Sequence, residues 1–158
     1  MYPTILLAQI SYFDKSFMQS FGNTHHFFLH FPIALFIVAG IAELIYLATK
    51  NPNYQFTVKF LLIMGAIFLI PTILSGLALE EVGIITEANS RIFWWHKVFA
   101  FAALALSVIT ILTGIFSSQR GIYYLSLVLL ILSVIATVYF GYLLVFNQPA
   151  WLPSVFPG

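Results

Sequence analysis

Long apolar stretches with few charged residues alternate with short polar connections along this chain. Four of these stretches predict membrane-spanning helices: Phe27 to Thr49, Phe60 to Leu79, Val98 to Gln119 and Ile122 to Phe146. Each is close to the roughly 20 residues that an α-helix needs to cross about 30 Å of hydrocarbon. The predicted connections are Lys50 to Gln55, Glu80 to Arg91 and Ser117 to Gly121. Because they are short, we predict an all-α fold, an integral membrane up-down-up-down four-helix bundle.

Composition also indicates a membrane protein. Of 158 residues, 61% are hydrophobic and 7% are charged, whereas soluble domains carry about 25% charged residues. The net charge of +1 gives no basic surface of the kind that binds nucleic acid. The absence of cysteine excludes disulfides, thiolate metal sites, iron–sulfur clusters and haem attached through thioethers.

The two ends of the chain differ from the helical domain at 25–146. Residues 1–24 have apolar positions at helical spacing but no signal-peptide features, so we expect an interfacial helix there. Residues 147–158 form a tail rich in proline and aromatic residues, and its prolines prevent a helix. The first and third connections carry basic residues without nearby acids, namely Lys50, Lys59 and Arg120. This pattern predicts a bacterial inner-membrane protein with both termini in the periplasm.

All four histidines fall at the same predicted end of the bundle. His25, His26 and His30 begin the first helix, and His96 begins the third. His96 also opens a stripe of small and polar residues at helical spacing: Ala100, Ala103, Ser107, Thr110 and Gly114. Such a stripe faces other helices or a cofactor, so His96 is expected to point into the bundle. Because the first and third helices run the same way, we expect His30 and His96 to face each other.

Two imidazoles that meet across a four-helix core are typical of a b-type haem site. We therefore predict haem b between helices one and three, with His30 and His96 as ligands of the haem iron. Arg91 and Lys97 are candidates to pair with the haem propionates. His26 is a candidate either to bond a propionate or to carry a proton from a quinol.

Other interpretations of the same residues stay open. His26, His30, His96 and Glu80 together would suit a zinc, copper or iron ion, and a chlorophyll-type pigment would need one axial histidine. A third alternative is a non-catalytic structural subunit of a larger membrane complex. His25 and Glu43 are interpreted as polar residues at the membrane interface. An aromatic belt is predicted from Trp94, Trp95, Tyr123, Tyr124 and Trp151.

The segment His26 to Leu35 reads HFFLHFPIAL. It resembles the H-x-x-x-HFPIAL signature of a widespread bacterial family of predicted four-helix membrane proteins whose function is unknown. The segments Ser75 to Glu81 and Arg91 to His96 are similar to later motifs of that family, although Phe27 replaces a usual proline and Glu80 a usual aspartate. The resemblance covers the chain from Thr24 to Phe146. It implies a cytochrome b-like role and marks His26, His30 and His96 as the family's histidines.

These observations together predict an electron-transfer subunit and not a stand-alone enzyme. No Gly-x-Ser-x-Gly elbow, Walker-type loop or H-E-x-x-H pair is present in the sequence. The expected partners are the lipid bilayer, a quinone or quinol, and other membrane subunits or a periplasmic cytochrome c of a respiratory or photosynthetic complex.

Overall fold

The computed structural model describes residues 14–83, 89–116 and 120–146 of the chain. Within these residues, four helical segments are long and apolar enough to cross a membrane: Asp14–Thr49, Pro52–Glu81, Ser90–Ile115 and Arg120–Phe146. The described residues contain no strand. The predicted all-helical membrane fold is therefore confirmed. The expected Pro-rich tail and the first part of the expected interfacial helix lie outside the described residues.

The first helical segment begins earlier than the sequence pattern predicted. Residues 14–23 are helical, and turns at Thr24 and Leu29 separate them from α2 (His25–Phe28) and α3 (His30–Thr49). A Cβ atom added at Gly22 would lie 2.7 Å from Leu79 Cδ2 and 3.1 Å from the Leu79 backbone nitrogen. Gly22 therefore packs closely against α4 (Pro52–Glu81), while most of residues 14–21 are exposed.

The other helices are α4 (Pro52–Glu81), α5 (Ser90–Phe116) and α6 (Arg120–Phe146). The predicted start of α4 was too late, because the polar residues of the first connection cap the helix. Lys50 ends α3 in a left-handed conformation with a φ of 56°. The Asn51 side chain then accepts a hydrogen bond of 3.0 Å from the Asn53 backbone nitrogen, and Pro52 follows at the first helical position.

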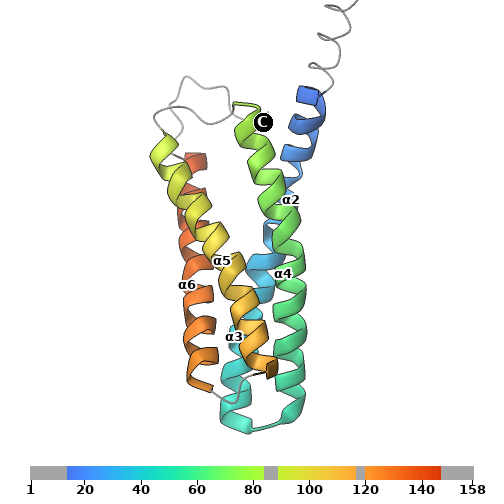
Figure 1. Cartoon of the computed structure of the whole chain (residues 1–158), viewed down its shortest axis with the longest axis vertical. Helices are drawn as coiled ribbons and strands as arrows, with labels where there is room; N and C mark the ends of the chain where they lie inside the picture. Colours follow the sequence, from blue (N-terminus) through green and yellow to red (C-terminus); the bar gives the residue numbers. More distant parts are fainter. Residues whose placement is uncertain (1–13, 84–88, 117–119, 147–158) are drawn as a thin grey trace, which may run out of the picture.

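Figure 1 shows α3 beside α4 and α5 beside α6, with all four helices running along the long axis of the molecule. The core between them contains Phe36, Leu62 and Leu130, which are almost completely buried. Glycines allow the helices to approach closely. Between α4 and α3, a Cβ atom at Gly65 would lie 2.6 Å from Phe36 Cε1, and between α3 and α6, Gly40 faces the Ile131 side chain. Small residues at helix contacts are typical of membrane bundles.

The outer surface of the helices is apolar. Large hydrophobic side chains are exposed on each helix, including Leu44 on α3, Ile70 on α4, Val108 on α5 and Leu132 on α6. A soluble protein of this size would not expose so much apolar surface. The helices therefore face lipid on the outside, which agrees with the absence of charged residues from these positions.

Candidate functional site

His25 and His96 lie side by side at one end of the bundle. Their ring centroids are 6.4 Å apart, and the planes of the two rings meet at 72°. His25 comes from α2, within the first helical segment, and His96 comes from the first turns of α5. The two imidazoles therefore bridge the α3–α4 pair of helices and the α5–α6 pair.

Each of these histidines is held by a backbone carbonyl of the helix beside it. His25 Nδ1 lies 2.8 Å from the Thr72 oxygen on α4, and His96 Nδ1 lies 2.9 Å from the Thr137 oxygen on α6. Because a carbonyl oxygen only accepts, Nδ1 must donate in both rings. The neutral imidazoles then have Nε2 without a proton and available to bind a metal.

A glycine lies beneath each of the two rings. A Cβ atom at Gly76 would lie 3.0 Å from His25 Cε1, and one at Gly141 would lie 3.2 Å from His96 Cε1. Each glycine follows, by four positions, the threonine whose carbonyl holds the same histidine. The two helix pairs thus hold their histidines in the same way, with a Thr-x-x-x-Gly segment of the neighbouring helix.

The structure places His25 beside His96, whereas the sequence predicted His30 in that position. His30 is exposed, and its Nδ1 donates to the His26 carbonyl oxygen at 2.7 Å. His26 is also exposed, with its ring centroid 6.1 Å from that of His25. His25, which was interpreted as an interface residue, is the histidine that the structure places next to His96. The backbone stays helical through Leu29, so His25 shares the helix face of the buried residues Pro32, Phe36 and Glu43, whereas His30 lies about 140° around the helix from His25.

The two basic residues nearest His96 in the sequence, Arg91 and Lys97, differ in their exposure and their partners. Lys97 forms an ion pair with Glu80, which joins α5 to α4, and its Nζ lies 4.8 Å from the centroid of the Phe93 ring. Arg91 is exposed at the start of α5. A propionate of a bound group would therefore compete with Glu80 for Lys97, whereas Arg91 is accessible.

The alternative metal site of three histidines and Glu80 is not assembled in this structure. Within 14–83, 89–116 and 120–146, no group of three or more His, Asp or Glu side chains is close enough to hold a metal ion. Glu80 is instead paired with Lys97. A site for a single ion would thus have only the two imidazoles of His25 and His96.

The spacing of the two rings fits a metal centre ligated from both sides. A metal held between two imidazoles binds each nitrogen at about 2 Å, with each ring centre about 1 Å further out, so the centres stand about 6 Å apart. The observed 6.4 Å between His25 and His96 agrees with this value. Hydrogen bonds from the other ring nitrogen to carbonyl oxygens are the usual support of histidine ligands. One imidazole from each helix pair is the type of ligand that a haem iron takes, and this is the chemistry that His25 and His96 offer.

The small-residue stripe of the third helix faces inward, as predicted. Ala103, Ser107 and Thr110 are buried, and Gly114 lies against the Tyr123 ring of α6. This stripe lies along the contact with the other helices, below the histidine pair.

Two other sequence-based interpretations were wrong. Glu43 is not an interface residue with its carboxylate in solvent, since it is 3% exposed and accepts a hydrogen bond of 2.8 Å from the Tyr123 hydroxyl. Tyr123 is likewise buried and does not belong to an aromatic belt. Trp94 and Trp95 are exposed, and Trp151 lies outside the described residues. An acidic residue within a predicted span was the available signal for a buried polar pair.

Comparison with known proteins identifies the family. Residues 23–147 match the family described as "Predicted membrane protein (DUF2231)". The chain belongs to this family. No curated protein and no solved structure matches the chain significantly. Family membership and the four apolar helices together establish an integral membrane protein, and the histidine pair lies within the matched region.

Proposed function

We propose that this chain is a membrane electron-transfer subunit that binds haem b, with His25 and His96 as the axial ligands. The observation that carries the proposal is the pair of imidazoles from two different helix pairs, 6.4 Å apart, each with Nδ1 donating to a carbonyl oxygen. The sequence-based prediction of a bis-histidine haem is kept, but one ligand changes from His30 to His25.

The surrounding residues act by orienting the two ligands. The carbonyl oxygens of Thr72 and Thr137 set the tautomer and the direction of each ring. Gly76 and Gly141 leave the space that each ring occupies. Haem b, when bound, supplies one-electron redox chemistry between these ligands. The chain contributes the binding and orientation of the cofactor and no catalytic group of its own.

The position of the pair suggests how electrons would enter and leave. His25 and His96 lie in the half of the bundle that contains the starts of the first and third spans, so a cofactor between them is nearer to one membrane surface than to the other. Arg91 is accessible there to pair with a propionate, and exposed Trp94 and Trp95 lie beside it. We propose that this end faces the periplasm of a bacterial inner membrane. The donor and acceptor would then be a membrane quinol and a periplasmic cytochrome c, or another subunit of the same complex.

Visible spectroscopy of the full chain, purified in detergent from cells with an adequate haem supply, tests the proposal. The dithionite-reduced minus air-oxidised spectrum is measured for the wild type, His25→Ala, His96→Ala and His30→Ala. We expect the sharp α-band of six-coordinate b-type haem in the wild type and in His30→Ala. The band is lost or broadened in the other two variants, because each then has one axial ligand.

His30→Ala is the matched control, because it removes an exposed imidazole from the same segment. Circular dichroism shows that each variant keeps its helices. A flat spectrum of folded wild-type protein would refute the haem proposal. A band that survives His25→Ala but disappears in His30→Ala would return the ligand assignment to His30.

A further inference from the structure

A second polar site lies at the opposite end of the bundle from the histidines. Its central residue is Glu43 of α3, which is 3% exposed. One carboxylate oxygen, Oε2, accepts the hydrogen bond of 2.8 Å from the Tyr123 hydroxyl. The other oxygen, Oε1, is buried and has no hydrogen-bond partner. A buried acceptor without a donor is costly, so Oε1 is available to a hydrogen-bond donor that enters beside it.

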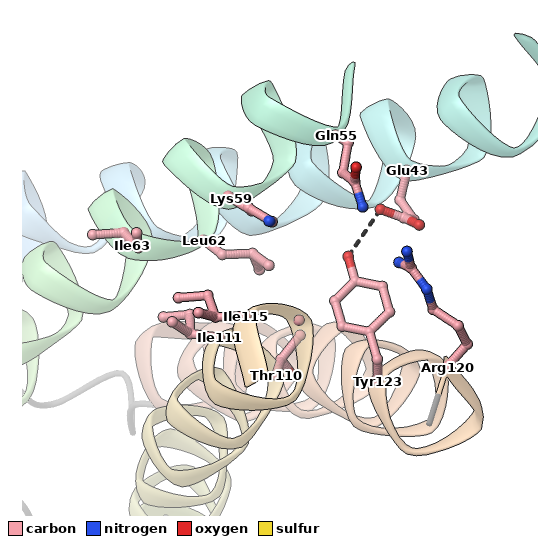
Figure 2. A pocket seen from close by; sticks show the side chains of 11 residues that line it. Glu43, Gln55, Lys59, Leu62, Ile63, Thr110, Ile111, Ile115, Arg120 and Tyr123 are labelled. Carbon is pink, nitrogen blue, oxygen red and sulfur yellow. Dashed lines mark hydrogen bonds between the residues drawn. The ribbon is translucent and has the colours of Figure 1, made fainter. Parts of the chain in front are cut away.

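A small cavity opens beside this carboxylate, as Figure 2 shows. Its volume is about 10 Å³, close to the smallest that holds one water-sized group. Residues of all four helices line it, including Glu43 of α3, Lys59 of α4, Thr110 of α5 and Arg120 of α6. The cavity therefore lies where the two helix pairs meet.

Two cationic side chains also line this cavity. Lys59 and Arg120 are both exposed, and both reach toward Glu43 from neighbouring helices (Figure 2). Within the part of the chain that the structure describes, neither side chain forms an ion pair with a carboxylate. The mouth of the cavity thus presents two positive charges, and its interior presents one carboxylate oxygen.

The polar Gln55 of α4 also lines the cavity, with its amide directed toward Glu43 (Figure 2), and the remaining large side chains of the lining are apolar. Leu62 and Ile63 come from α4, and Ile111 and Ile115 come from α5. Ile63 and Ile115 are exposed on the outer surface of the helices. A hydrocarbon chain that follows this surface would therefore lead directly to the charged mouth.

The depth of the site in the membrane can be calculated from the helix length. At 1.5 Å a residue, the 30 residues of α4 span about 45 Å, which matches a bilayer with its headgroups. Lys59 lies seven residues after Pro52, so it is about 10 Å from the start of the helix. This depth is close to the boundary between lipid headgroups and hydrocarbon.

We propose that this cavity binds the headgroup of a phospholipid that carries a primary ammonium, namely phosphatidylethanolamine. The ammonium group donates a hydrogen bond to Glu43 Oε1, and the phosphate lies between Lys59 and Arg120. The acyl chains follow the apolar surface between α4 and α5. An ammonium group is about the size of a water molecule and carries three N–H donors, so it matches both the volume and the missing donor.

This charge pattern also predicts which lipids bind weakly. Phosphatidylcholine has a trimethylammonium group, which is too large for the cavity and has no N–H donor. Phosphatidylglycerol would pair with Lys59 and Arg120 but brings no cation to Glu43. The inference does not depend on haem, since the histidine pair lies at the other end of the helices.

Native mass spectrometry of the full chain in detergent tests the proposal. The protein is titrated with ethanolamine, choline and glycerol phospholipids that have identical short acyl chains. For the wild type we expect the ethanolamine lipid to bind about tenfold or more tightly than the choline lipid, as for a hydrogen bond to a charged group. In Glu43→Gln this preference falls to near one, while Lys59→Gln and Arg120→Gln weaken all three lipids.

Glu81→Gln is the matched control, because it neutralises an exposed acid at the histidine end. Glu43→Gln keeps an acceptor for Tyr123, and its helix content is checked by circular dichroism. Equal binding of the ethanolamine and choline lipids to the wild type would overturn the proposal and leave a cavity for water only. Retention of the preference in Glu43→Gln would equally overturn it.

Discussion

The hydrogen bond between Tyr123 and Glu43 provides a quantitative test of how this bundle tolerates a buried acid. Tyr123→Phe removes the hydroxyl that donates to Glu43 Oε2. Since Glu43 Oε1 has no partner within the described residues, both carboxylate oxygens would then be buried without a donor. The aromatic ring, which packs against Gly114, is unchanged. The variant therefore isolates the hydrogen bond.

The expected cost follows from the charge and burial of the acceptor. A hydrogen bond to a charged group contributes about 1.5–3 kcal/mol, and an unsatisfied buried partner adds to the loss. We expect Tyr123→Phe to lower the free energy of unfolding by about 2–3 kcal/mol. Glu43→Leu on the Tyr123→Phe background removes the unsatisfied acceptor and replaces it with an apolar side chain. The double variant should therefore be more stable than Tyr123→Phe alone.

Equilibrium unfolding of the purified chain in mixed micelles, followed by circular dichroism, measures these differences. The micelles contain choline lipid only, so no primary ammonium is present to bind Glu43. Tyr124→Phe is the control, because it removes a hydroxyl from the next residue and leaves the Tyr123 bond intact. The double variant is compared with Tyr123→Phe and Glu43→Leu alone. If the losses of unfolding free energy in the two single variants simply add in the double variant, the two side chains are not coupled, and the hydrogen bond does not have the inferred energetic role.

Two glycine substitutions test the close contacts of the bundle. Gly76→Ala would place a Cβ atom 3.0 Å from His25 Cε1, so the ring must move. We expect haem titration to show roughly 5- to 150-fold weaker binding, equivalent to about 1–3 kcal/mol of overpacking. Gly65→Ala would place a Cβ atom 2.6 Å from Phe36 Cε1. We expect this variant to lose about 1–3 kcal/mol of unfolding free energy, without a direct effect on the haem spectrum. Gly121→Ala is the control for both, since nothing lies within 4 Å of its Cβ position; a loss as large in this variant would show that contacts are not the cause.

The helical membrane fold was predictable because it depends on properties that are local in the sequence. A run of apolar residues such as Ile122 to Phe146 is helical in lipid whatever its neighbours are, since its backbone groups must bond within the segment. The boundaries were less predictable. The charge on Lys59 suggested a connection, but a helix in the headgroup region continues past a charged residue, and Asn51 and Pro52 determine where α4 begins.

The candidate site was predicted only in part. His96 was expected to point inward because the stripe that follows it is small and polar, and it does contact α6 through Thr137 and Gly141. The partner histidine was missed because the charge-free run alone does not show which face of the first helix is buried. The backbone stays helical through Leu29, so His25 shares the face of the buried Pro32, Phe36 and Glu43. His30 lies about 140° around that helix from His25 and is exposed.

The sequence alone determines that this chain is an all-helical membrane protein with its histidines gathered at one end, because hydropathy and chain order suffice for both conclusions. Only the tertiary structure decides which side chains meet. His25 reaches His96, and Glu43 is enclosed with Tyr123, residues separated by 71 and 80 positions respectively. Such contacts depend on the rotation of each helix about its axis. That rotation is set by glycines and small residues of the neighbouring helices, and no single segment encodes it.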